Sequence, residues 1–158
     1  MRRTIFMTMA LAALISVPLA GATELTRDEY LARAEPICKH NTEANKRIFQ
    51  GATAEVKAGK LKAASTHFTR ARAAFEKTIA QLGAVPRPVA DEAKLGKWLG
   101  YLEVESSYLG RIGKALAKED KAKAQTLSVR LNRNSNLANN TVLAFGFDYC
   151  KIDPARFG

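Results

Sequence analysis

Apolar residues recur every three or four positions through most of this chain, and that spacing predicts amphipathic helices. The first stripe runs from Tyr30 to Val56, and Gly59 is expected to end its helix. Thr26 and Glu29 have the spacing of a capping box, in which the two side chains bind free backbone N–H groups at a helix start. Pro36 lies inside the stripe and should bend the helix or loosen its first turns.

Three further stripes cover residues 61–82, 89–118 and 120–145. The segment at residues 85–88 (VPRP) breaks the pattern between the second and third helices, and Gly146 is expected to stop the fourth. Four amphipathic helices with short connections predict an all-α fold, an up-down-up-down four-helix bundle.

Residues 1–22 have the pattern of an export signal. Arg2 and Arg3 precede an apolar run that ends at Leu19, and small residues follow at 20–22. The run is shorter than the roughly 20 residues that span a bilayer, which favours cleavage over an uncleaved N-terminal anchor. We therefore predict a signal peptide at residues 1–22 and a single mature domain at residues 23–158. Such a domain is long enough to bury one hydrophobic core.

The sequence contains two cysteines, Cys38 and Cys150. In an exported protein they predict one disulfide, which would staple the bundle. A straight fourth helix would place Cys150 about 14 Å from the level of Cys38 at the α-helical rise. The bridge therefore requires the chain to fold back after Gly146. We interpret the bridge as structural, because the C-x-x-C spacing of redox proteins is absent.

Three segments of the chain resemble an uncharacterised family of small secreted actinobacterial proteins. They are residues 30–39 (YLARAEPICK), 85–88 (VPRP) and 145–150 (FGFDYC). The resemblance covers nearly the whole predicted mature chain. It implies a small exported helical bundle with one early and one C-terminal cysteine, and it supports their pairing. It implies no activity and no functional residues.

Sequence motifs for catalysis and for cofactors are missing. There is no G-x-S-x-G, no Glu-x-x-His of a di-iron bundle and no C-x-x-C-H for haem. A turn at Gly59 would hold His40 and His67 roughly 16 Å apart, whereas an earlier turn near Gly51 would bring them level. Glu103 and Glu105 are two residues apart and do not share a helix face. We expect no enzyme activity, no metal and no cofactor.

Polar residues interrupt the apolar stripes at matching heights in the predicted bundle. Asn45, Ser106 and Asn134 should form one layer, with Asn41 one turn away. Buried amides without partners cost about 1–3 kcal/mol each, so these groups should bind one another or water. One interpretation is a layer that fixes helix register, as a buried asparagine does in coiled coils. The other is a small polar cavity that accepts a ligand.

Four glycines, Gly96, Gly100, Gly110 and Gly113, lie in the third predicted helix. Each costs about 1 kcal/mol relative to alanine there. We interpret them as positions of close helix approach, with a bend or groove beside Trp98 as the alternative.

Without residues 1–22 the chain keeps 23 basic and 15 acidic residues, a net charge of +8. Lysines gather at two predicted turns that should share one end of the bundle. They are Lys57, Lys60 and Lys62 at the first turn and Lys114, Lys118, Lys121 and Lys123 at the third. This basic end could contact an anionic envelope polymer or a membrane surface, or could simply be solvated. Aromatic residues are not interleaved with the lysines, so sequence-specific nucleic-acid binding is not expected.

The leading hypothesis is therefore an exported, non-enzymatic binding or interaction protein of the cell envelope or extracellular space. It would act through the basic end or through a protein partner that the sequence does not identify. The alternative is a carrier of a small ligand, with haem or a metal as its narrower forms, that uses the polar layer inside the bundle.

Overall fold

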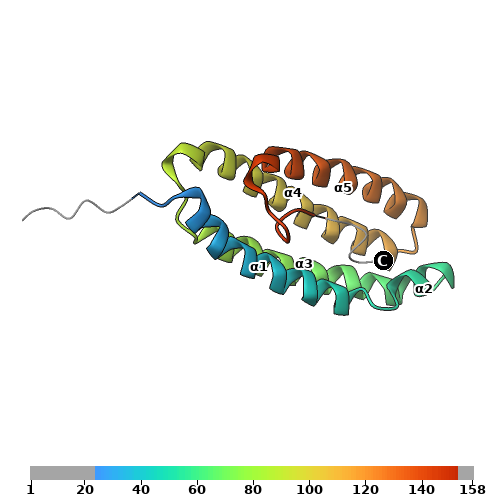
Figure 1. The fold of residues 1–158 in the computed structure, drawn as a ribbon. Helices are drawn as coiled ribbons and strands as arrows, with labels where there is room; N and C mark the ends of the chain where they lie inside the picture. Colours follow the sequence, from blue (N-terminus) through green and yellow to red (C-terminus); the bar gives the residue numbers. More distant parts are fainter. Residues whose placement is uncertain (1–23, 153–158) are drawn as a thin grey trace, which may run out of the picture.

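The computed structural model describes residues 24–152, and that part of the chain is helical without strands (Figure 1). Five α-helices and two short 3-10 helices follow one another along it. They are α1 (Arg27–Ile48), α2 (Ala52–Lys57), α3 (Leu61–Gly83), η1 (Val89–Asp91), α4 (Glu92–Ala117), α5 (Lys121–Thr141) and η2 (Leu143–Phe145). The predicted export signal lies outside the described residues. None of the helices in 24–152 is long and apolar enough to cross a membrane.

The helix starts and stops follow local sequence signals. Thr26 and Glu29 form the predicted capping box, with the Thr26 side chain accepting from the Glu29 N–H and the Glu29 carboxylate accepting from the Thr26 N–H. α1 is continuous through Pro36. The fourth helix, predicted to reach Gly146, is shorter than predicted, because α5 ends at Thr141. Gly146, with φ 72°, ends the separate 3-10 helix η2 in the left-handed conformation that favours glycine.

The prediction of one continuous helix from Thr26 to Gly59 is wrong, because the helix is interrupted after Ile48. α1 ends at Ile48, and α2 is a separate helix of six residues. Gly51 adopts φ 86° at the break, and Gly59 adopts φ 73° before α3. Residues with a side chain avoid this left-handed region, so both glycines are suited to these turns.

The main helix contacts join α1 to α3, α3 to α4 and α4 to α5. Within residues 24–152 no comparable packing joins α1 to α5. The chain after Gly146 folds back into the space between these two helices (Figure 1). The long helices thus form an open array, and the C-terminal segment at residues 146–152, here called the tail, closes part of its open side.

The predicted disulfide between Cys38 and Cys150 is present and ties the tail to α1. Two polar contacts hold the same segment. The Glu35 carboxylate accepts from the Asp148 and Tyr149 N–H groups, and Asn139 exchanges two hydrogen bonds of 2.8 Å with the Ile152 backbone. The required fold-back is therefore confirmed.

Buried apolar residues form two clusters at opposite ends of the helices. The first contains Trp98 and Phe147, whose rings stack with centroids 5.4 Å apart. The second contains Leu61, Ile112 and Leu127, near the turns that precede α3 and α5. On α4 and α5 the buried residues between the two clusters are polar, and they lead to the candidate site. They are Glu105, Ser106, Asn134 and Ser135.

Of the four glycines in α4, Gly113 shows the predicted close helix approach. A Cβ there would lie 3.3 Å from Phe68 Cβ and 3.4 Å from the Ser65 carbonyl oxygen, both on α3. Gly100, by contrast, has open space around it. A Cβ at Gly110 would likewise lie 2.8 Å from Nη1 of Arg72 on α3, so the glycines mark close helix approach at two positions, Gly110 and Gly113.

Candidate functional site

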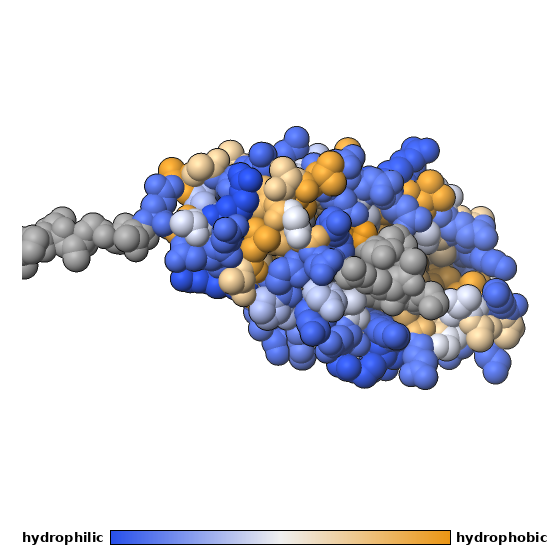
Figure 2. All heavy atoms as spheres, viewed as in Figure 1, coloured by the Kyte–Doolittle hydropathy of each residue, from blue (hydrophilic) through white to orange (hydrophobic). Residues whose placement is uncertain are grey.

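A cavity of about 740 Å³ lies between the helices on the open side of the array. All five α-helices and the tail contribute to its walls. Apolar residues are visible in a hollow on this face, towards the α2 end (Figure 2). The cavity is the consequence of α1 and α5 standing apart with only the tail between them.

Most of the cavity wall is apolar. Near α2 it includes Phe49 and Phe68, which pack edge to face with ring centroids 5.1 Å apart. Ile112 on α4 continues this wall. Towards the tail it includes Leu102 and Trp98. A long apolar molecule could therefore contact hydrocarbon along the length of the cavity.

Glu105 is the acidic residue in this lining. It lies on α4 between the two apolar clusters and is only 7% exposed. The Ser135 hydroxyl on α5 donates to its Oε1 at 3.1 Å, and its Oε2 has no hydrogen-bond partner among residues 24–152. Burial raises the pKa of Glu105 to about 8, although the hydrogen bond from Ser135 acts in the opposite direction. The carboxyl group is therefore mostly neutral at pH 7.

Asn41 and Asn45 also line the cavity, from α1. Asn45 Nδ2 donates to Asn41 Oδ1 at 3.2 Å. Asn45 is 6% exposed, and its Oδ1 has no partner in the described part of the chain. Trp98 Nε1 is a third buried polar atom in the lining that lacks one. Two of the predicted ligand-binding residues thus belong to the cavity.

The structure places the other two, Ser106 and Asn134, outside the lining of this cavity. Asn134 Nδ2 donates to the Tyr101 carbonyl oxygen at 2.8 Å, which connects α5 to α4. The Ser106 hydroxyl donates to Glu76 on α3 at 3.4 Å. These contacts fit the register interpretation of the polar layer rather than the ligand interpretation.

Sequence reasoning missed Glu105 and Ser135 as members of the site. In the sequence, Glu105 stands out only as a neighbour of Glu103, with which it does not share a helix face. A usable signal was present, because Trp98, Leu102 and Leu109 continue the helical spacing through position 105. A carboxyl group at an apolar stripe position indicates burial.

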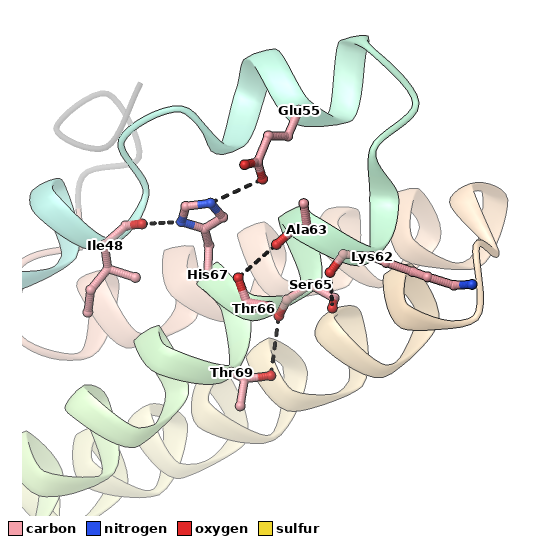
Figure 3. Close-up of polar contacts among 8 residues, drawn as sticks. All are labelled: Ile48, Glu55, Lys62, Ala63, Ser65, Thr66, His67 and Thr69. Atoms are coloured by element: carbon pink, nitrogen blue, oxygen red, sulfur yellow. Dashed lines mark hydrogen bonds and ion pairs between the residues drawn. The ribbon is translucent and has the colours of Figure 1, made fainter.

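His67 holds α2 against α3 and α1 (Figure 3). Its Nδ1 contacts the carbonyl oxygen of Ile48 at the end of α1, and its Nε2 lies 3.1 Å from the Glu55 carboxylate on α2. α2 contributes Ala52 and Val56 to the cavity wall. The imidazole therefore supports one rim of the cavity through its contacts with neighbouring elements.

The two histidines do not form a shared metal site. His40 is exposed on α1, eight residues before the end of the helix that His67 contacts, or about 12 Å at the helical rise. The described residues contain no group of three or more histidines, cysteines or acidic residues that could hold a metal ion.

The seven lysines of the predicted basic end are all exposed. An ion pair of 3.6 Å between Lys62 and Glu119 joins the turns before α3 and α5, so the two turns do lie at one end. Asp120 adds a second negative charge there and caps α5 by accepting from the Lys123 N–H. Lys57 and Lys121 also line the cavity. The basic end and the cavity are therefore neighbours.

No family model matches this chain, and neither a curated protein nor a solved structure is similar enough to it to count as a match.

Proposed function

We propose that this protein is an exported, non-enzymatic binding protein that carries an apolar small molecule in the cavity beside Glu105. The observation that supports this most directly is the cavity itself. Its volume of about 740 Å³ lies within the range of roughly 300–1,000 Å³ that ligand pockets occupy.

The chemistry of the walls also favours binding. Ligand sites are mostly apolar, with a few polar groups that orient the ligand. Here the lining combines aromatic and aliphatic side chains with three buried polar atoms that have no partner within residues 24–152, on Asn45, Trp98 and Glu105. These groups could orient a ligand without supplying a nucleophile or a metal.

Export is part of the proposal. It is supported by the sequence pattern of residues 1–22 and by the disulfide, since such bridges persist mainly in oxidising compartments outside the cytoplasm. In this proposal the four long helices keep the predicted up-down-up-down order, and the single domain acts in the envelope or extracellular space.

The basic end is a second candidate for function, as a contact with an anionic envelope polymer or membrane. The observation in its favour is that Lys57 and Lys121 belong both to this end and to the cavity lining. Docking there would bring the cavity close to a surface from which an apolar molecule could be taken. Retention on anionic vesicles that falls with added salt would support this role, and absence of retention at low salt would exclude it.

The carrier function can be tested with the neutral fluorescent probe N-phenylnaphthylamine. The wild-type protein should bind it saturably at one site. The variant Leu109→Trp replaces a leucine of the cavity wall with a bulky indole ring and should bind the probe at least about tenfold more weakly. Leu137→Trp is the matched control, because Leu137 is half exposed on α5 and lies outside the cavity lining.

Two results would contradict the carrier function. One is an absence of saturable binding by the wild type, and the other is equal loss of binding in the Leu109 and Leu137 variants. Circular dichroism of both variants would establish that each is folded.

A further inference from the structure

We propose that the ligand of this cavity carries an uncharged carbonyl group, whose oxygen accepts a hydrogen bond from the Glu105 carboxyl group. This inference rests on the proposed carrier function and names the ligand class. A long-chain ketone is the simplest molecule of that class.

The first support is the geometry around Glu105. The carboxyl group is more than nine-tenths buried, and one of its oxygens, Oε1, accepts from Ser135. The other oxygen, Oε2, has no partner in residues 24–152 and belongs to a side chain that lines the cavity. Buried polar groups in proteins are nearly always hydrogen-bonded. A ligand group is therefore the natural partner of Oε2.

The second support is the charge state of Glu105. Burial raises its pKa to about 8, so the carboxyl group is mostly neutral at pH 7 and Oε2 can act as a donor. The side chains that line the same cavity from α1, α3 and α5 include Asn45, Phe75 and Ser135, which are uncharged. Apart from Glu105, the charged residues of the lining are the exposed Lys57, Lys121 and Lys151. No ion pair to Glu105 is present among the described residues that would keep it ionised.

The other buried polar groups in the cavity also favour a ligand group that accepts hydrogen bonds. In the described part of the chain, Trp98 Nε1 is a second donor of the lining without a partner, against one acceptor, Asn45 Oδ1. Among residues 24–152, the buried polar groups that an anionic ligand group would meet in the lining are uncharged, and one of them, Asn45 Oδ1, is an acceptor that would repel it. The charged residues at the rim are lysines, which would oppose the entry of a cation.

The rim lysines are Lys57, Lys121 and Lys151, all exposed. A cationic ligand would have to pass them and then lose its hydration together with an ionised Glu105, and burying two charges is costly. An uncharged carbonyl avoids both costs.

The test uses four molecules with the same chain: dodecanone, chlorododecane, dodecylamine and dodecanoate. Each competes with N-phenylnaphthylamine for the wild-type protein at pH 7. We expect dodecanone to compete at a concentration about tenfold lower than chlorododecane, which has no comparable acceptor. The amine and the carboxylate should compete less well than the ketone.

Two variants connect the preference to Glu105. Glu105→Leu should still bind the apolar probe but should bind dodecanone and chlorododecane equally. Glu105→Gln keeps an N–H donor of similar size and should keep the preference for the ketone.

The pH profile separates the donor role from a purely structural one. Wild-type affinity for dodecanone should fall about tenfold between pH 7 and about pH 9, because ionisation of Glu105 removes the donor hydrogen. Glu105→Gln should show no such fall, since the glutamine amide does not ionise. Chlorododecane serves as the control that reports any general change in the cavity.

Several outcomes would overturn the inference. If dodecylamine competes best, Glu105 acts as an ionised partner for a cation. If the ketone and chlorododecane compete equally in the wild type, the carrier function is retained, but the inference that the ligand carries a carbonyl group is wrong. If none of the four molecules and no probe binds, the carrier function itself fails.

Discussion

At the scale of single residues, Glu105 is the group that most distinguishes this protein from an ordinary helical bundle. It occupies a position of the α4 stripe whose neighbours, Leu102 and Leu109, are apolar. Desolvation disfavours its charged form, and Ser135 satisfies only one of its oxygens. An acid in this setting binds its proton more tightly in the folded protein than in the unfolded chain.

This difference predicts how stability depends on pH. The folded-state pKa of Glu105 is about 8, whereas the unfolded value is about 4.3. Between these values the folded state holds the extra proton, so the free energy of unfolding should fall as pH rises from about 4.3 to about 8. The contribution of this one group should approach 1.4 kcal/mol per pH unit, about the value of one pKa unit.

Urea unfolding of the wild type and of Glu105→Gln, followed by circular dichroism across this range, would measure the effect. The difference between the two proteins isolates Glu105 from the other acids, and the variant should gain relative stability as pH rises. Parallel pH profiles would show that Glu105 is not buried as described.

The candidate site could be predicted from the sequence only in part, because the direction in which each side chain leaves its helix was not known. Asn41 and Asn45 were placed in an internal polar layer and do line the cavity. Asn134 was placed at the same height, but its amide points to the Tyr101 carbonyl oxygen. Height along a bundle can be counted from the sequence. The direction in which a polar side chain leaves its helix depends on how neighbouring helices are rotated, and one sequence does not specify that rotation.

At the scale of elements, the break between α1 and α2 shows a similar limit. Ala52 and Val56 continue the apolar spacing of α1 and are both in the cavity lining. The periodic signal therefore runs across the break without a change of phase. Gly51 was the available cue, and its φ of 86° is the reason the helix stops there. A single glycine in a helical pattern is often tolerated, so the cue alone did not decide between a helix and a turn.

The short helix α2 should depend on His67 for its position. Six residues are too few to form a stable helix alone. His67 contacts both the end of α1 and Glu55 of α2. In His67→Ala the amide hydrogens of residues 52–57 should exchange several-fold faster, because local opening of α2 loses those contacts.

Hydrogen exchange read by mass spectrometry would test this. His40→Ala is the matched control, since His40 is exposed on α1 and should leave α2 unchanged. Equal exchange in all three proteins would show that the packing of Phe49 on Phe68 alone holds this region.

At the scale of the whole molecule, the tail connects α1 and α5, which do not pack directly on one another as the other neighbouring helices do. It crosses between these two helices. The sequence predicted the bridge between Cys38 and Cys150 and the fold-back that it requires. The sequence offered a small polar cavity as one interpretation of the polar layer, but it did not indicate the mostly apolar cavity beside the tail. That cavity depends on the separation of two helices that are far apart in the sequence.

Removal of the disulfide should therefore affect stability and binding differently. The bridge closes a loop with a sequence separation of 112 residues, and in the chain-entropy model a loop of this size contributes about 4–5 kcal/mol by restricting the unfolded chain. The double variant Cys38→Ala/Cys150→Ala should lose about that much in urea unfolding.

Binding should survive this loss at low temperature, where the variant is still folded. Glu35 and Asn139 hold the tail through backbone hydrogen bonds that do not need the bridge, so the tail should stay in the cavity wall. The affinity for N-phenylnaphthylamine should then remain within about threefold of the wild type, which is a change of less than about 1 kcal/mol in binding free energy. If the folded variant instead loses the probe, the disulfide shapes the cavity directly. In that case reduction of the bridge would release the ligand, and the staple would be part of the binding function rather than a support for the fold.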